Sequence, residues 1–114
     1  MASPVFFDSI NRAAIVLTQK QPFNDWVRSI DPTVNPEEIQ EPGLYLIPDF
    51  ETAEEMEEWI KLFWDLLFKD QMNNWYMDEK LWVKNRSPDL FKKYFSYTLI
   101  PLVLDISDDP LETY

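Results

Sequence analysis

Residues 13–18 read Ala-Ala-Ile-Val-Leu-Thr, a short apolar run that is partly β-branched. Polar residues bound this run on both sides, and Pro22 follows shortly after it. A short apolar run bounded in this way predicts a buried β-strand. A helix should follow over residues 22–30, because apolar residues recur there at helical spacing and Pro22 fits the first helical position.

Working outward from this strand, two more strands and three more helical segments are expected. Residues 43–48 and 97–106 read as strands, and Pro101 should lie at a sheet edge or a bulge because proline cannot donate to a ladder. Helices are predicted over residues 35–39, from Thr52 to about residue 70, and from Ser87 onward. Each of these helices begins with a side chain that is typical of an N-cap.

The order strand, helix, strand, helix, helix, strand predicts the α+β class, with a small three- to four-stranded sheet and helices packed mainly on one face. A parallel, right-handed crossover is one way to join the first two strands, and the strand order stays open. The 114 residues suit a single domain over 1–114. We expect residues 1–10 to be an entry arm and 107–114 an acidic tail.

Composition excludes several classes of function. The chain has 21 acidic and 10 basic residues, and a formal charge of −11 disfavours nucleic acid and anionic membranes as partners. Without cysteine or histidine there can be no disulfide, thiol or histidine catalysis, or Cys/His zinc site. The single glycine, Gly43, cannot build a phosphate-binding loop. We expect a cytoplasmic protein without enzymatic activity, catalytic residues, bound metal or cofactor.

Carboxylates are the one plentiful group that could carry chemistry. Asp49 and Glu51 follow one predicted strand, and Asp105, Asp108 and Asp109 lie at or after the end of another. Strand ends often carry sites, so a small carboxylate-dependent metal-binding protein or enzyme is the alternative reading. No spacing matches a calcium loop, and solvated surface acids explain the pattern more simply. At least three of these carboxylates would have to converge on one ion.

The charges are unevenly distributed along the chain. Nine acidic and no basic residues lie between positions 37 and 58, whereas five basic residues and one acidic residue lie between 80 and 93. Such a distribution can steer a partner or a second copy, although acids in the first turns of a helix are commonly just solvated. The charge also fits an acidic mimic of nucleic acid or an immunity-type inhibitor, which is a further alternative.

The chain has five tryptophans, five tyrosines and eight phenylalanines, which small domains use in cores and in interfaces. Trp26 and Trp59 fall at helical spacing and are predicted to be core residues. Residues 71–86 lack a clean period and read as an aromatic loop or short turns. The predicted interaction surface consists of Trp75, Tyr76, Trp82 and Arg86.

Burying an aromatic side chain is worth roughly 2 to 3 kcal/mol, so this segment should be partly covered. We predict that Leu81 and Trp82 pack inward, that Trp75 or Tyr76 stays partly open, and that Arg86 pairs with an acid between positions 37 and 58. The function that fits is a non-enzymatic domain that binds another protein or forms a homodimer.

The chain resembles a group of small uncharacterised bacterial proteins in five stretches, residues 11–17, 20–26, 44–48, 58–59 and 81–91. In that group, a strand, a Pro-Phe-x-x-Trp helix and a Leu-Trp-x-x-x-Arg segment followed by a Phe-rich helix occur in the same order. The resemblance covers most of residues 10–106, with a less polar stretch at 99–101 than the group has. It implies a free-standing bacterial domain and brings no assigned activity.

Overall fold

The computed structural model describes residues 8–114 and has the α+β architecture that the sequence predicts. Its elements are β1 (Asp8–Ser9), β2 (Arg12–Gln19), α1 (Gln21–Ile30), α2 (Pro36–Ile39), β3 (Gly43–Pro48), α3 (Ala53–Asn73), the 3-10 turn η1 (Glu79–Leu81), α4 (Pro88–Tyr94), β4 (Phe95–Ile100) and β5 (Leu104–Asp105).

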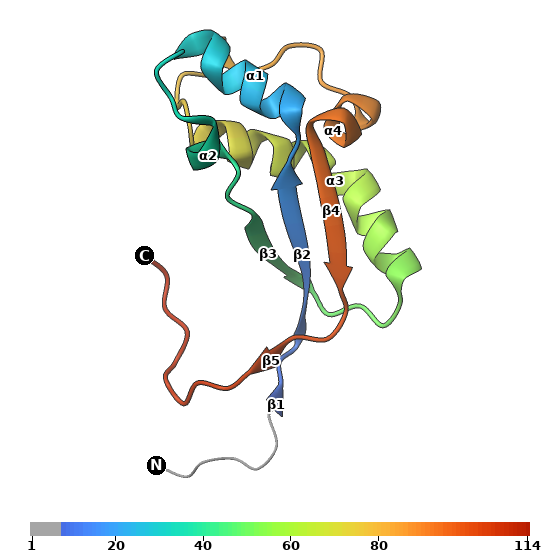
Figure 1. Cartoon of the computed structure of the whole chain (residues 1–114). Helices are drawn as coiled ribbons and strands as arrows, with labels where there is room; N and C mark the ends of the chain where they lie inside the picture. Colours follow the sequence, from blue (N-terminus) through green and yellow to red (C-terminus); the bar gives the residue numbers. More distant parts are fainter. Residues whose placement is uncertain (1–7) are drawn as a thin grey trace.

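The main sheet has the order β3-β2-β4, and the strand predicted at residues 13–18 lies in its centre. β2 pairs antiparallel with both neighbours, so a parallel crossover between the first two strands is not what forms. The reason is visible in Figure 1: α1 and α2 lie beyond one end of the strands instead of crossing a face of the sheet, so the chain returns in the opposite direction.

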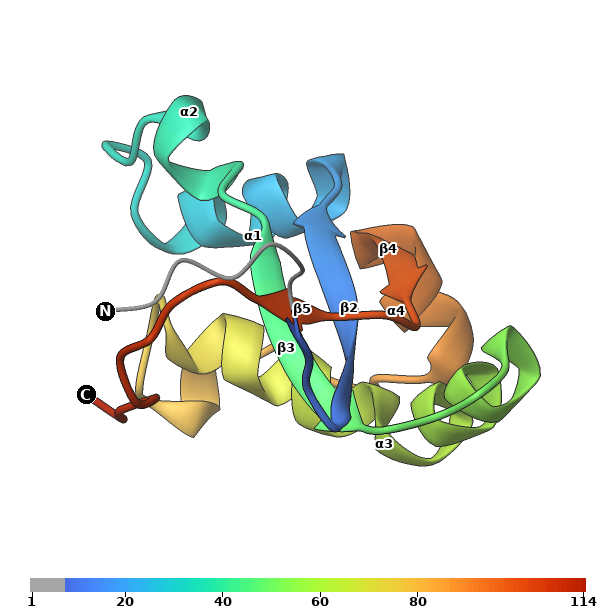
Figure 2. The ribbon, with the colours of Figure 1, turned by 90° about the horizontal axis from the view of Figure 1, so that it is seen from below.

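One long helix, α3, covers one face of this sheet. The Tyr45 hydroxyl of β3 donates to the Asp70 carboxylate at 2.6 Å, and the Tyr97 hydroxyl of β4 donates to the Glu57 carboxylate at 2.7 Å. The two contacts lie near opposite ends of α3, so the helix crosses the sheet diagonally. Figures 1 and 2 show α3 on one side of the strands, and among the described residues no helix lies over the middle of the other face, here called the uncovered face.

The core lies between β2 and the helices. Ala13, Ile15 and Leu17, the alternate residues of β2, are fully buried. They adjoin a cluster of phenyl rings in which Phe95 contacts Phe23, Phe68 and Phe91 with centroid distances of 5.0, 5.3 and 5.4 Å. Trp26 and Trp59 pack against this core, as predicted, although each is only half-buried.

The local helix signals are confirmed. The side chains of Asn35, Thr52 and Ser87 each accept a hydrogen bond from a main-chain N–H in the first turn of the helix that follows. α3 continues to Asn73, a few residues beyond the predicted end.

The predicted strand at 97–106 is wrong in its extent. β4 begins at Phe95 and ends at Ile100, because Pro101 stops the ladder. β4 is an edge strand of the sheet, which is one of the two placements that the proline predicted. The chain then pairs again through β5, which forms a separate two-stranded ribbon with β1. Of the predicted entry arm, residues 1–7 lie outside the described part of the chain. The predicted tail, 107–114, is exposed.

Candidate functional site

Aromatic side chains fasten the predicted site segment to the core. The Tyr76 hydroxyl donates to the Val27 carbonyl of α1 at 2.7 Å, and the Trp82 Nε1 donates to the Tyr76 carbonyl at 2.7 Å. The Trp26 Nε1 of α1 donates to the Leu81 carbonyl at 3.0 Å. All three rings are half-buried against the core, and the polar atom of each donates a hydrogen bond within the chain.

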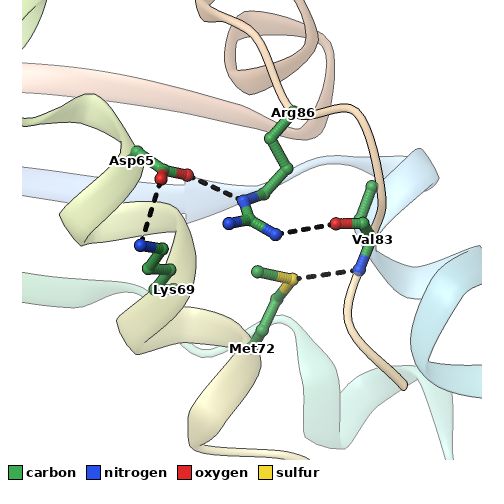
Figure 3. Close-up of polar contacts among 5 residues, drawn as sticks. All are labelled: Asp65, Lys69, Met72, Val83 and Arg86. Atoms are coloured by element: carbon green, nitrogen blue, oxygen red, sulfur yellow. Dashed lines mark hydrogen bonds and ion pairs between the residues drawn. The ribbon is translucent and has the colours of Figure 1, made fainter. Parts of the chain in front are cut away.

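Arg86 pairs with Asp65 on α3, not with an acid between positions 37 and 58 as predicted. Its Nε donates to the Asp65 carboxylate at 2.7 Å and a terminal nitrogen donates to the Val83 carbonyl at 2.8 Å (Figure 3). The Lys69 Nζ lies 3.4 Å from the other Asp65 oxygen. Burial opposes ionisation of Asp65, but Arg86 and Lys69 outweigh it and hold the pKa of this carboxyl below its usual value.

The C-terminal half of α3 therefore contacts the segment through a main-chain N–H as well as through the ion pair, as Figure 3 shows. The Val83 N–H donates to the Met72 Sδ at 3.4 Å. The prediction that Leu81 packs inward is wrong: its side chain is 41% exposed, because only its carbonyl is held by α1. Trp82 is half-buried, as are both Trp75 and Tyr76.

The four predicted site residues do not share one surface. Trp82 and Arg86 line a surface hollow of about 250 Å³ together with Lys69 and Glu79. Trp75 lines a different hollow, described below.

The free edge of the sheet at β3 is a second candidate, which the sequence analysis missed. The Lys20 N–H, just past β2, donates to the Tyr94 carbonyl, which precedes β4. Main-chain groups alternate sides along a strand, so even-numbered residues of β2 face β4 and odd-numbered ones face β3. Ile47, Tyr45 and Gly43 are the partners of these odd-numbered residues.

It follows that the main-chain N–H and C=O groups of Leu44 and Leu46 point away from the sheet, where no strand within residues 8–114 pairs with them. Their side chains are also exposed, by 61% and 46%. The two leucines lie on the uncovered face, since the intervening Tyr45 contacts α3. β3 thus offers unpaired ladder groups and apolar surface at the same place.

An apolar hollow of about 310 Å³, here called the β3 groove, runs between this edge and α3. Its lining residues are Tyr45, Leu46, Ile47, Trp59, Leu66, Leu67 and Asp70. Leu66 is 59% exposed, and Phe63 stacks its ring near that of Trp59 with centroids 4.8 Å apart. The side of α3 next to β3 is therefore apolar and accessible.

A second hollow of about 400 Å³, here called the polar hollow, lies where β2 ends and β3 begins. Two buried amides stand in its wall: the Gln19 Nε2 donates to the Gln71 Oε1 at 2.8 Å and to the Glu41 carbonyl at 3.0 Å. The Gln71 Nε2 in turn contacts the Tyr45 hydroxyl at 2.8 Å. Burial, with the hydrogen bond to Asp70, raises the pKa of Tyr45 far above its usual value.

The acids named for the alternative function do not gather. Among residues 8–114, no group of three or more acidic side chains is placed so that it could hold a metal ion. Geometry therefore gives no support to a carboxylate-based metal site at Asp49, Glu51, Asp105, Asp108 and Asp109. Within the same described range, none of the helices has the length and apolar character needed to cross a membrane.

Comparison with protein-family models, with curated proteins and with solved structures finds no match. The resemblance to small bacterial proteins stays a prediction.

Proposed function

We propose that this chain is a non-enzymatic binding domain that takes up an extended segment of a partner protein along the free edge of β3. The observation that carries the proposal is the outward main chain of Leu44 and Leu46 beside the apolar β3 groove. Adding a strand to an exposed sheet edge is a recurrent mode of peptide recognition. Main-chain hydrogen bonds supply affinity and the neighbouring hollows supply side-chain preference.

The charge around β3 indicates which partner segment fits. The strand itself carries no charge, but Glu41 precedes it, Asp49 and Glu51 follow it, and Asp70 lines the groove. An apolar segment flanked by basic residues would complement these carboxylates. A second copy of this chain fits less well, because antiparallel pairing of two β3 strands would bring the acids at opposite ends of the strand together.

A synthetic peptide tests this proposal. The probe has six residues, the length of β3, with arginine at each end and alternating valine and threonine between. Isothermal titration of the whole chain with the peptide should show saturable binding. Light scattering of the chain without peptide should give the mass of a monomer. A dimer in which β3 is covered and the peptide does not bind would overturn the proposal in favour of self-association.

Two variants at one position separate main-chain from side-chain recognition. Leu46→Pro removes the outward N–H without removing a bond to β2, and should weaken peptide binding about tenfold, which corresponds to ~1.4 kcal/mol. Leu46→Thr keeps the N–H and should bind the peptide within about threefold of the unchanged chain. Equal binding by both variants, with circular dichroism showing both folded, would contradict docking along the edge. If Leu46→Pro does not fold, the probe is shortened to a dipeptide as the second test. Binding should then be lost, and a dipeptide that binds as tightly as the full probe would contradict docking along the edge.

A further inference from the structure

The polar hollow differs from the β3 groove in that its polar side chains outnumber its apolar ones. Of its lining residues, Glu38 and Glu41 supply carboxylates, Gln19, Gln71 and Asn74 supply amides, and Trp75 supplies an indole ring. No lysine or arginine lines it. The charged groups around the hollow are thus all acceptors, which favours a ligand that is a cation rich in N–H donors.

One acceptor in this wall is buried and unused. Gln19 is 8% exposed, and its enclosed Oε1 has no hydrogen-bond partner, whereas its Nε2 is bonded to both Gln71 and Glu41. A buried acceptor without a partner is unfavourable, so a ligand donor that moved a neighbouring side chain aside and reached this oxygen would be favoured. This unsatisfied amide is independent of the two carboxylates and points to the same kind of ligand.

The hollow is also continuous with the edge at which the partner segment would dock. Glu41, Pro42 and Gly43 line it, and the chain runs from there directly into β3. Gln71 lines the hollow and bonds to Tyr45, which lines the β3 groove, so the two share a wall. Gly43 lets the strand lie close to this wall, because a Cβ there would come within 3.1 Å of the Gln71 Nε2.

The size and the ring favour a guanidinium group over other cations. About 400 Å³ accommodates a planar guanidinium with its alkyl stem, and such a group can stack on an indole while bonding carboxylates in a fork. Trp75, one of the predicted interaction residues, supplies the ring.

We propose that the polar hollow binds an arginine side chain of the partner segment that docks along β3; this inference rests on the proposed function. Glu41 and Glu38 accept from the guanidinium nitrogens, Trp75 lies against its plane, and the segment's main chain continues along Leu44 and Leu46. The hollow then sets sequence preference, while the β3 edge supplies the affinity common to all extended segments.

The test compares the six-residue peptide described above with a second one in which citrulline replaces both arginines. Citrulline keeps the shape and removes the positive charge. The unchanged chain should bind the arginine peptide at least about tenfold more tightly. Equal binding of the two peptides would overturn the arginine site while leaving the proposed function intact. If neither peptide binds, both the arginine site and the proposed function are overturned.

A matched pair of variants locates the preference. Glu41→Gln removes a carboxylate from the hollow, and Glu112→Gln removes one from the exposed tail, with the same change in net charge. Glu41→Gln should reduce the preference for arginine over citrulline several-fold, and Glu112→Gln should leave most of it. Equal loss in the two variants would show that general attraction, not the hollow, recognises the arginine. A shift of the Trp75 indole N–H resonance with the arginine peptide only would support direct contact.

Discussion

The segment at 74–86 and the strand β3 are both apolar and both lie at the periphery, yet they use their polar groups in opposite ways. In the segment, the indole and hydroxyl groups of Trp82 and Tyr76 donate to carbonyls of the same chain, and Arg86 has its own acid. In β3, the main-chain N–H and C=O groups of Leu44 and Leu46 pair with no other strand in the part of the chain that the structure describes. The comparison teaches that an aromatic segment can use its polar groups within its own fold, which is why we place the proposed binding at the unpaired main chain of β3.

Among the substitutions that test this comparison, the largest change in the free energy of unfolding is expected at Trp82. Trp82→Ala removes a ring packed against the core and the donor to the Tyr76 carbonyl, so the free energy of unfolding should fall by about 3 kcal/mol. Trp82→Phe, which keeps a ring, should lower it by about 1 kcal/mol. Urea denaturation measures both values. A Trp82→Ala chain that is as stable as the unchanged one but no longer binds the peptide would make this segment the interaction surface.

The ion pair beneath the segment should have a smaller effect that depends on pH. Asp65→Asn removes the negative charge that pairs with Arg86, and about 1 kcal/mol of stability should be lost near pH 7, since the pair is partly exposed. The pKa of Asp65 is lowered from 3.8 in the folded chain, so its contribution is present above that value and disappears as the pH falls through the folded pKa.

Denaturation of the two chains over a series of pH values checks this sign. The difference between them should stay constant above about pH 5 and shrink below pH 3.8. A difference that grows on acidification would mean that Asp65 is not stabilised as an anion.

Tyr97 lies on β4, the edge strand opposite β3, and should make a smaller contribution to stability, which depends on alkaline pH. Burial, and then Glu57, raises the pKa of Tyr97 from 10.0 to about 12. The stabilising contribution of its protonated form is present below pH 10 and is lost as the pH rises toward 12. When the pH is raised from 10 to 12, the Tyr97→Phe chain should therefore lose less stability than the unchanged chain, as measured by thermal denaturation. An identical loss in both chains would place the alkaline sensitivity elsewhere.

The smallest effect on stability is expected at the β3 edge itself. Leu46→Thr changes an exposed side chain on an outer strand and keeps a strand-forming residue, so the free energy of unfolding should change by less than about 0.5 kcal/mol. The matched exposed leucine on α3, Leu62, should respond similarly when replaced by threonine, apart from the lower helix propensity of threonine. A loss above about 2 kcal/mol at Leu46 would show that this edge contributes to the core.

What could be predicted from the sequence was local. The caps at Asn35, Thr52 and Ser87 depend on side chains within a few residues of the N–H they accept from, so their spacing alone predicted where three helices begin. The central strand could be predicted because its apolar residues are contiguous. The fold class followed from the order of these elements.

What could not be predicted depends on contacts between distant residues. Residues 43–48 read as a strand closed by Pro48, and their apolar side chains do not show that only one side of the strand would be paired. The partner of Arg86 depends on how α3 crosses the sheet, which the charge distribution does not encode. One signal was present: Pro42 precedes the strand and Pro48 is its last residue, and proline is tolerated at sheet edges.

Residue-resolved amide hydrogen exchange across β3, with and without the arginine-ended peptide, tests the central claim most directly. In the free chain, the N–H groups of Leu44 and Leu46 should exchange rapidly, and those of Tyr45 and Ile47, bonded to β2, should exchange slowly. Adding the peptide should slow Leu44 and Leu46 and leave the indole N–H of Trp82 unchanged. Uniformly slow exchange in the free chain, or protection confined to residues 74–86, would contradict the account.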